Sequence, residues 1–329
     1  MNRVKNYLSL VTFSHTIFAM PFALIGFFLG LWKPLSIIGQ MNPNMATGWD
    51  DSLIESHDSL RHQLITGLNP YFATTLYLGL VILCMVFARS AAMAFNRWLD
   101  ANYDAMNPRT AVREIPAGII KPNNALVFTI VNCILFITST FFINRLCFYL
   151  SPVALFVILF YSYTKRFTAL CHLVLGVGLS LAPIGAYIAV TGRFGILPLL
   201  FSCTVLCWVS GFDIIYALQD EDFDKQNKLH SIPSTVGKVK ALRISEFLHV
   251  LSATFVIIAG FYGHFGWLYW AGAVFYICLL VYQHLLVKPN DLSKVNRAFF
   301  TTNGIASVLF AIFVILDLFF HKTNSWLVY

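Results

Sequence analysis

The chain has 329 residues, of which 58% are hydrophobic and only 11% are charged, and its mean hydropathy is +0.72. Soluble globular proteins carry about 25% charged residues, so this composition excludes a soluble enzyme and predicts an integral membrane protein. The net charge of +7 does not indicate nucleic-acid binding, because its placement fits membrane topology better. No obligate protein partner is indicated.

Nine apolar runs are long enough to cross a bilayer as helices. They fall at residues 9–32, 70–92, 123–143, 147–163, 169–190, 195–218, 242–263, 265–287 and 298–320. A β-barrel would show short alternating segments instead, so we expect an all-α integral membrane protein. We expect the whole chain, 1–329, to form a single polytopic domain. The seven cysteines lie almost entirely within apolar runs and form no Cys-x-x-Cys pair, so we expect neither a zinc site nor a disulfide framework.

The basic residues are distributed unequally between the two ends of these runs. Sixteen of the 22 Lys and Arg residues fall on the side of the N-terminus, five fall on the other side, and Arg89 lies within the second run. This bias predicts a multi-pass protein of the cell inner membrane with a cytoplasmic N-terminus. A polar insert at 33–66 then lies on the opposite side. Its Asp50 and Asp51 suggest a DDxxD metal motif, but Ile54 occupies the third acidic position, so we expect a solvated loop.

The most informative stretch is NRWLDANYDAMNPRTAVREIPAG, which directly follows the second run. Asn96, Asp100 and Asp104 are spaced by four and share one face of a helix. Two carboxylates and an amide in this arrangement favour a cation between them, and hard oxygen ligands suit Mg²⁺, which binds through carboxylates and substrate phosphates. Arg109 and Arg113 follow, also four apart, and would grip what the metal holds. The alternative is a solvated helix end with ordinary surface charges.

A second acidic stretch, DIIYALQDEDFDKQNKLHSIPSTVG, follows the sixth run. Asp213, Asp220 and Asp224 lie at i, i+7 and i+11 on one helical face, whereas Asp222 points elsewhere and should be solvated. Acids at the end of a membrane helix are costly when buried and indicate function. Two acidic faces on one side of a bundle would bracket a diphosphate through bridging Mg²⁺ ions.

Two shorter signals lie between and beside these stretches. Tyr161 and Lys165, at the end of the fourth run, are four apart and would face one pocket, although both types also anchor helices at membrane interfaces. Ser210 and Gly211 precede the second acidic stretch and indicate close helix packing. We expect residues 96–122 and 213–240 to form the motif and cap loops.

Taken together, these stretches resemble the UbiA superfamily of intramembrane prenyltransferases. The chain shows NxxxDxxxD after the second run, YxxxK after the fourth and YAxxDxxxD after the sixth, and NPRTAVREIPAG is similar to the family's NPRTxxRxxPxG. The HSIP form at 230–233 and SHTIFAMPFALIG in the first run resemble the 4-hydroxybenzoate polyprenyltransferase-like branch. The resemblance implies nine transmembrane helices bundled around a central cavity, with cytoplasmic cap loops.

The resemblance also assigns roles to individual residues. The implied metal ligands are Asn96, Asp100, Asp104, Asp220 and Asp224, and these four aspartates are the implied catalytic residues. The implied diphosphate contacts are Tyr161 and Lys165, and we expect Arg109 and Lys228 to contact the diphosphate as well. Independently of the resemblance, we expect Arg113 and His15 to contact the acceptor, with a packing role as the alternative for His15. Many members continue the second motif as DxKxGxxS, whereas here Gln226 replaces the Lys, Lys228 replaces the Gly, and Ser231 is kept.

We therefore expect an Mg²⁺-dependent enzyme that moves a polyprenyl group from polyprenyl diphosphate to a ring carbon of an aromatic acid. The first candidate acceptor is 4-hydroxybenzoate, as in ubiquinone biosynthesis. The alternative is a dihydroxynaphthoate in menaquinone biosynthesis, because the first run lacks the Arg–Asp–Lys cluster of better-known hydroxybenzoate enzymes and carries His15 instead. Haem-farnesylating and lipid-ether enzymes are further alternatives within the superfamily.

Two other classes of membrane protein also use acidic residues. A transporter with intramembrane acids is disfavoured because these acids gather at one membrane face rather than at the midplane. CDP-alcohol phosphotransferases are disfavoured because their DGxxAR signature is absent.

Overall fold

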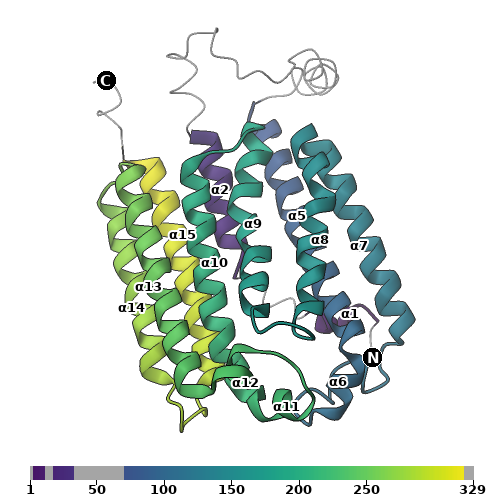
Figure 1. Ribbon diagram of the computed structural model, residues 1–329. Coiled ribbons are helices and arrows are strands. Elements are labelled where there is room, and N and C mark those ends of the chain that lie inside the picture. The colour runs from purple at the N-terminus through teal and green to yellow at the C-terminus, as the bar shows by residue number, and fades with distance from the viewer. Residues whose placement is uncertain (1–2, 12–17, 33–69, 322–329) are drawn as a thin grey trace.

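A computed structural model of the chain describes residues 3–11, 18–32 and 70–321 (Figure 1). Within these ranges the secondary structure is helical, apart from one isolated β-bridge between Lys288 and Asp291. Eight of the described helices are long and apolar enough to cross a membrane, and one further apolar helix is shorter. The predicted all-α membrane fold is confirmed.

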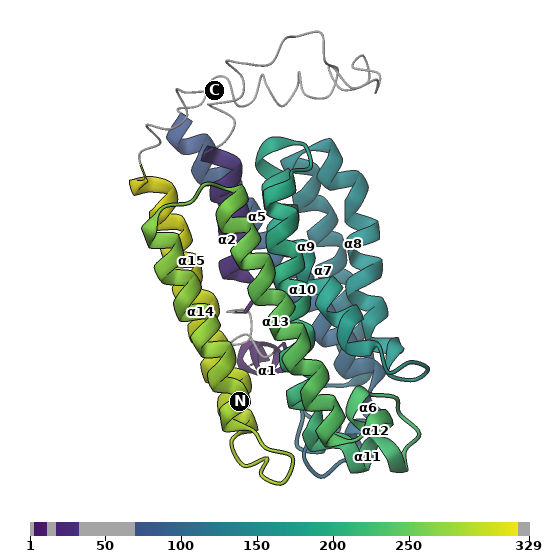
Figure 2. The same ribbon diagram turned by 60° about the vertical axis from the view of Figure 1, so that its left-hand side comes forward.

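The long helices run side by side along the bundle (Figures 1 and 2). They are α5 (Pro70–Leu99), α7 (Pro122–Ile143), α8 (Arg145–Thr164), α9 (Cys171–Thr191), α10 (Ile196–Ala217), α13 (Lys238–Tyr262), α14 (Trp267–Leu286) and α15 (Asn303–Phe320), the last preceded by the π-helical turn η3 (Arg297–Thr302). The shorter helices are α1 (Arg3–Leu10), α2 (Met20–Trp32), α6 (Ala101–Met106), the 3₁₀ turn η2 (Leu218–Asp220), α11 (Glu221–Gln226) and α12 (Ile232–Val236).

Eight of the nine apolar runs agree with these helices to within a few residues, except at the end of α5. That helix continues from the expected end at residue 92 to Leu99, because its last turns carry polar side chains that line an internal cavity rather than face lipid. The first run, 9–32, lies partly outside the described residues, and its described part includes the 13-residue helix α2. The insert at 33–66 and His15 also lie outside them.

Helix α10 lies at the centre of the bundle and packs against α9, α13 and α2. It is the most buried of the eight candidate spans, with 67% of its apolar stretch inside the protein against 17% for α8. An aromatic core surrounds it: Trp208 contacts Phe22 of α2 at a ring-centroid distance of 5.3 Å and donates a hydrogen bond to Asn303 at 3.0 Å. This core fixes the position of the acidic end of α10.

Close contacts between helices depend on small residues in α10. A Cβ at Gly211 would come within 2.4 Å of the His249 ring in α13, and Ser210 lies against Gly176 of α9. The close packing predicted for Ser210 and Gly211 is therefore confirmed. It holds α9, α10 and α13 in a fixed register near the second acidic stretch.

The connecting segments that carry the motifs meet at one end of the bundle, where α6, α11 and α12 lie together (Figures 1 and 2). The loop between α11 and α12 is joined to the end of α8, because the His230 N–H donates to the Lys165 carbonyl at 2.7 Å. Ser231 then caps α12 in a reciprocal capping box with Ser234. These contacts place the second motif beside the end of α8.

Candidate active site

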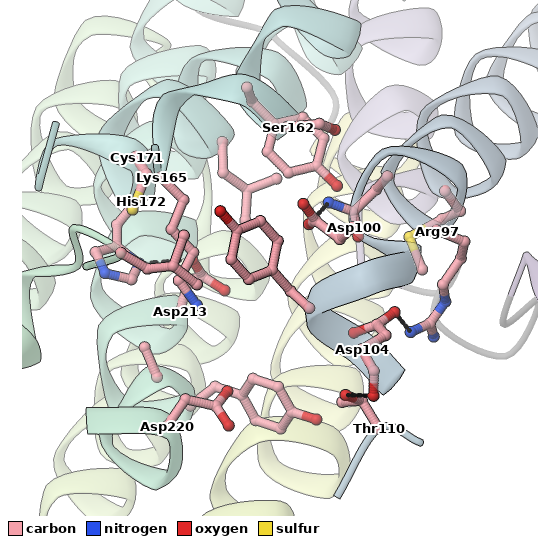
Figure 3. A pocket seen from close by; sticks show the side chains of 18 of the residues that line it. Arg97, Asp100, Asp104, Thr110, Ser162, Lys165, Cys171, His172, Asp213 and Asp220 are labelled. Carbon is pink, nitrogen blue, oxygen red and sulfur yellow. Dashed lines mark hydrogen bonds and ion pairs between the residues drawn. The ribbon is translucent and has the colours of Figure 1, made fainter. Parts of the chain in front are cut away.

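A polar cavity of about 300 Å³ lies between the ends of α5, α8, α9 and α10 and the short helix α6 (Figure 3). Asp100 and Asp104 come from one side of it, and Lys165 and Asp213 come from the other. Eight predicted site residues line this cavity: Asn96, Asp100, Asp104, Arg109, Arg113, Tyr161, Lys165 and Asp220. Segments far apart in sequence therefore meet at one place.

The first motif keeps its helical spacing across the boundary between α5 and α6. The Asp100 N–H donates to the Asn96 carbonyl at 2.9 Å, and the Asp104 N–H donates to the Asp100 carbonyl at 2.8 Å. The Asn96 amide also donates to Asp100 Oδ2 at 3.2 Å. The expected alignment of the three side chains on one face is present.

Each acid of this motif is held by a basic side chain. Arg166 lies 3.2 Å from Asp100, and Arg113 lies 2.6 Å from Asp104. Burial raises the pKa of Asp100, and the Arg166 guanidinium opposes this increase without cancelling it. Asp104 is only 6% exposed, and its Oδ2 accepts no hydrogen bond from any described residue, the nearest basic group being Arg97 at 4.0 Å. The motif thus has one buried carboxylate oxygen that is available to a ligand or a metal ion.

Asp220 of the second motif is bound by the loop that follows the first motif. Arg109 donates through Nε at 3.1 Å and through Nη2 to the two oxygens of Asp220, and through Nη1 to the Tyr216 hydroxyl at 2.8 Å. Asn107 adds a hydrogen bond to Asp220 at 3.2 Å. Such a fork-to-carboxylate pair is directional as well as strong. Asn107 is a contact that motif spacing did not reveal.

Asp224 is fully buried behind this cavity and has two partners. Lys165 Nζ lies 2.7 Å from Oδ1, and the Ser231 hydroxyl donates to Oδ2 at 2.8 Å. Burial alone would lower the pKa of Lys165. The charge of Asp224 and its hydrogen bond outweigh this effect, so the pKa is raised and the ammonium stays charged. The Tyr–Lys motif is thereby tied to the second acidic motif.

His172, a buried residue that sequence reasoning missed, pairs with Asp213 of the second acidic stretch on the α9–α10 side of the cavity. His172 Nδ1 is 2.7 Å from Asp213 Oδ2, and His172 Nε2 accepts a hydrogen bond from the Ile232 N–H at 3.3 Å. Because Nε2 is an acceptor, Nδ1 carries the proton, and the neutral ring donates to Asp213. The signal in the sequence was a histidine in the first turn of an apolar run.

Arg89 of α5 also lines the polar cavity, although the sequence indicated only that it falls inside a span. Its Nε is buried without a hydrogen-bond partner. A charge inside a transmembrane run is itself a signal of function.

Two of the predicted residues are not among those lining the cavity, and a third lies outside the described part of the chain. Lys228 is exposed, in a left-handed backbone conformation with φ 55°, and makes no contact that supports its predicted diphosphate role. Asp224 lies behind the lining, as described above. His15 falls in the undescribed segment. Asp222 is exposed, as expected.

A metal ion fits the donor set but not an all-protein cage. In the part of the chain that the structure describes, no three His, Cys, Asp or Glu side chains converge on a common metal position. The available donors are carboxylate and amide oxygens, and Asp104 Oδ2 is buried without a hydrogen bond. Mg²⁺ usually binds through one or two carboxylates plus substrate phosphates. The residues therefore suit Mg²⁺ that is shared with a phosphate-bearing ligand.

An apolar cavity of about 340 Å³ adjoins the polar one between α5, α7, α8 and α9. Five residues line both cavities: Arg89, Met93, Tyr161, Leu175 and Leu179. Elsewhere its lining is mainly aliphatic. The site thus consists of a polar cavity and an apolar cavity that share part of their lining.

Residues 67–305 match the model of the UbiA prenyltransferase family. The 4-hydroxybenzoate octaprenyltransferase of Francisella tularensis subsp. mediasiatica is 28% identical over 239 residues, which cover 73% of this chain and 84% of that protein. The 4-hydroxybenzoate octaprenyltransferase of Tolumonas auensis is 29% identical over 68% of this chain and 78% of its own length.

Solved structures show the same fold. The apo structure of a UbiA homolog from Aeropyrum pernix K1 has a TM-score of 0.71 at 24% identity, covering 92% of this chain and 98% of that one. A UbiA homolog from Archaeoglobus fulgidus bound to DMAPP and Mg²⁺ has a TM-score of 0.66 at 18% identity, covering 96% and 99%.

Proposed function

The chain belongs to the UbiA prenyltransferase family, and we propose that it transfers a polyprenyl group from a polyprenyl diphosphate to a ring carbon of an aromatic acid, with 4-hydroxybenzoate as the first candidate. The observation that carries the proposal is the polar cavity, where both acidic motifs meet basic side chains beside an apolar cavity. Relatives named 4-hydroxybenzoate octaprenyltransferase support the acceptor, and the Archaeoglobus homolog bound to DMAPP and Mg²⁺ supports the diphosphate and the metal.

The polar cavity would receive the diphosphate. The side chains that line this cavity and would hold Mg²⁺ there are Asn96, Asp100, Asp104 and Asp220. Asp224, the fifth expected ligand, lies behind the lining and is bound by Lys165 and Ser231. Bound Mg²⁺ supplies a Lewis acid that neutralises the charge of the leaving diphosphate. Arg109 pairs with Asp220 and Lys165 pairs with Asp224, so both positive charges are held beside the second motif. They stabilise the negative charge that develops as the carbon–oxygen bond breaks.

The apolar cavity would receive the first isoprene units of the tail. It lies within the span of the membrane helices and shares part of its lining with the polar cavity. A substrate with its diphosphate in the polar cavity would therefore extend its hydrocarbon chain into the apolar cavity. A long tail would leave between helices into the lipid. An apolar pocket with a few convergent polar groups is the usual form of a small-molecule site.

Aromatic side chains would protect the allylic cation. Phe299 of η3 lies against Tyr216 at a ring-centroid distance of 4.2 Å and against Phe212 at 5.2 Å, and all three line the polar cavity. Their faces stabilise positive charge, and they exclude water that would otherwise capture the cation.

Asp213 is the proposed base for the ring proton. One of its oxygens accepts from His172, and the other has no hydrogen-bond partner in the described part of the chain. After the ring carbon bonds to the prenyl carbon, the proton on that ring carbon passes to this free oxygen and aromaticity returns. His172 holds the carboxylate in place, because its ring is fixed on its other side by the Ile232 N–H.

The cytoplasmic orientation of the cavity and the location in the inner membrane belong to the same proposal. They rest on the Lys and Arg bias. Single cysteines at positions 55 and 230, in a cysteine-free background, should react with an impermeant reagent from opposite sides of the membrane. Labelling of both from the same side would contradict this orientation.

Release of pyrophosphate tests the function. Purified protein in lipid nanodiscs, given Mg²⁺, a prenyl diphosphate and 4-hydroxybenzoate, should release pyrophosphate only when all three are present. Chelation of the metal should stop the release, and added Mg²⁺ should restore it. Release that is independent of any aromatic acceptor would contradict prenyl transfer to such an acceptor.

A further inference from the structure

Tyr216, in the last turn of α10, lines the polar cavity and uses only one hydrogen-bonding function of its hydroxyl. The phenol oxygen accepts a hydrogen bond from Arg109 Nη1 at 2.8 Å. A tyrosine hydroxyl can also donate its proton, and within the described ranges no protein group accepts it. Tyr269 of the aromatic core differs, because its hydroxyl donates to the Val256 carbonyl at 2.6 Å. The donor function of Tyr216 is therefore available to a ligand in the polar cavity.

A single guanidinium holds this hydroxyl beside a carboxylate of the second motif. Arg109 donates through Nη1 to Tyr216, and through Nε and Nη2 to Asp220. Its guanidinium carbon also lies 5.2 Å from the centroid of the Tyr216 ring. A positive charge that donates to the phenol oxygen polarises the phenol and makes its O–H a stronger donor. A diphosphate that shares Mg²⁺ with Asp220 would thus lie next to this donor.

The position of Tyr216 along α10 places it between two other groups of the site. Asp213, Tyr216 and Asp220 stand at i, i+3 and i+7, and all three line the polar cavity. Asp213 is the proposed base for the acceptor ring, and Asp220 is an expected metal ligand. The Tyr216 ring packs on Phe299 at a centroid distance of 4.2 Å, so neighbouring side chains fix its position. One side chain thus offers an aromatic face to the allylic cation and a hydroxyl to the departing anion.

We propose that the Tyr216 hydroxyl donates a hydrogen bond to the leaving diphosphate as its carbon–oxygen bond breaks. The inference rests on the proposed function and adds a catalytic residue to it. The bonding electrons pass to the diphosphate oxygen, and the proton stays on the phenol. The hydrogen bond strengthens as negative charge grows on that oxygen. An interaction that is stronger in the transition state than in the bound substrate raises kcat rather than affinity.

Removal of the hydroxyl alone tests this role. Tyr216→Phe keeps the ring, and in nanodiscs with geranyl diphosphate and 4-hydroxybenzoate it should lower kcat about 10- to 100-fold, with both KM values within about threefold of wild type. Tyr163→Phe is the matched control. Tyr163 also faces a guanidinium, that of Arg166 at 5.6 Å, but it lines neither cavity. Its kcat should stay within about twofold of wild type.

Binding without turnover separates this role from a structural one. We would titrate geranyl thiolodiphosphate, an unreactive analogue, calorimetrically into purified protein in the presence of Mg²⁺. Tyr216→Phe should bind it within about threefold of wild type, because the proposed interaction develops in the transition state. If Tyr216 only positions Arg109 against Asp220, the affinity for this analogue should decrease as much as kcat does.

A fluorinated donor isolates the step in which the carbon–oxygen bond breaks. Fluorine at C2 of geranyl diphosphate withdraws electrons from the allylic cation, so ionisation limits the rate. Tyr216→Phe should lower kcat about 10- to 100-fold with this donor as well. Tyr216→Leu also removes the aromatic face, and with geranyl diphosphate it should release more prenyl alcohol than Tyr216→Phe does, because water then captures the cation.

Several outcomes would overturn the assignment. A wild-type kcat in Tyr216→Phe would do so, as would a parallel loss of affinity for the thiolodiphosphate. An effect that vanishes with the fluorinated donor would assign the hydroxyl to a later step at the acceptor ring. A wild type that forms no prenylated product with any acceptor rejects the proposed function and this inference together, whereas an active wild type matched by Tyr216→Phe rejects the inference alone.

Discussion

The two adjoining cavities have similar volumes, about 300 and 340 Å³, but one is lined by many charged side chains and the other mainly by aliphatic ones. The polar cavity holds acidic and basic side chains at the end of a membrane bundle, and several of them pair across distant segments, as in Asp100–Arg166 and Asp220–Arg109. The apolar cavity needs no such pairing, because its lining is made of aliphatic side chains that any spanning helix supplies. The charged compartment therefore depends on the tertiary register of the helices far more than the apolar one does.

This contrast has a physical consequence for mutation. Removing one partner of a buried ion pair leaves the other charge uncompensated, whereas filling part of an apolar cavity changes only the available space. Changes in the polar cavity should therefore abolish the reaction, and changes in the apolar cavity should alter which substrate is accepted.

The largest expected effect comes from the acids. Asp100→Ala and Asp220→Ala should each lower kcat about 1000-fold or more, because each removes a carboxylate that holds the metal and orders a basic side chain. The double variant should be little worse than either single one. Steady-state kinetics in nanodiscs measures this, with Asp222→Ala as the control, since that exposed acid belongs to the same segment. Full activity of either single variant would remove the metal role from that motif.

The next largest effect concerns the proposed base. Asp213→Asn should lower kcat about 100- to 10,000-fold with both KM values nearly unchanged, because binding is kept and only proton removal is lost. His172→Leu, which removes only the donor that orients Asp213, should lower kcat about tenfold. A deuterium isotope effect on the ring hydrogen should appear in Asp213→Asn. If KM changes and kcat does not, Asp213 binds substrate rather than accepting the proton.

A smaller effect is expected in the apolar cavity. Gly185 lines it, and a Cβ there would have no atom within 4 Å, so Gly185→Leu fills space without a clash. The variant should lose about tenfold in kcat/KM with octaprenyl diphosphate while geranyl diphosphate is used within about twofold of wild type. Gly79→Leu is the matched control, because Gly79 is equally open but lines neither cavity. Equal losses with both donors would show that this cavity does not hold the tail.

The smallest effect is expected in the polar insert. Replacing Asp50 and Asp51 by Asn should change kcat/KM by no more than about twofold, because the sequence places them across the membrane from the acidic motifs. A larger decrease, measured in the same nanodisc assay, would make the insert part of the site.

Sequence reasoning predicted the spans and the helical face of the first motif because their signals are local. The spacing of four between Asn96, Asp100 and Asp104 survives a helix boundary, and the lengths of apolar runs give the spans directly. The contacts that complete the site were not local. Asn107 and Arg109 reach Asp220 across more than a hundred residues, so no spacing within one segment reveals them.

The same limit explains the residues that were missed. The sequence shows that Arg89 lies in a span, but only the packing of α5 against α8 and α9 shows that it lines both cavities. His172 pairs with Asp213 because α9 and α10 pack in a register set by small residues such as Gly176. Lys228 stands where the family pattern has Gly, and it is exposed on the loop before Ser231.

The most direct test of the central claim is mass spectrometry of the product. Purified protein with Mg²⁺ and octaprenyl diphosphate would be given 4-hydroxybenzoate, a dihydroxynaphthoate and a phenol without a carboxylate in parallel. The proposed function requires a new carbon–carbon bond between the prenyl chain and the ring of an aromatic acid, with 4-hydroxybenzoate the preferred acceptor and the simple phenol left unmodified. Products linked through oxygen, or prenylation of the simple phenol as fast as of the acids, would contradict it.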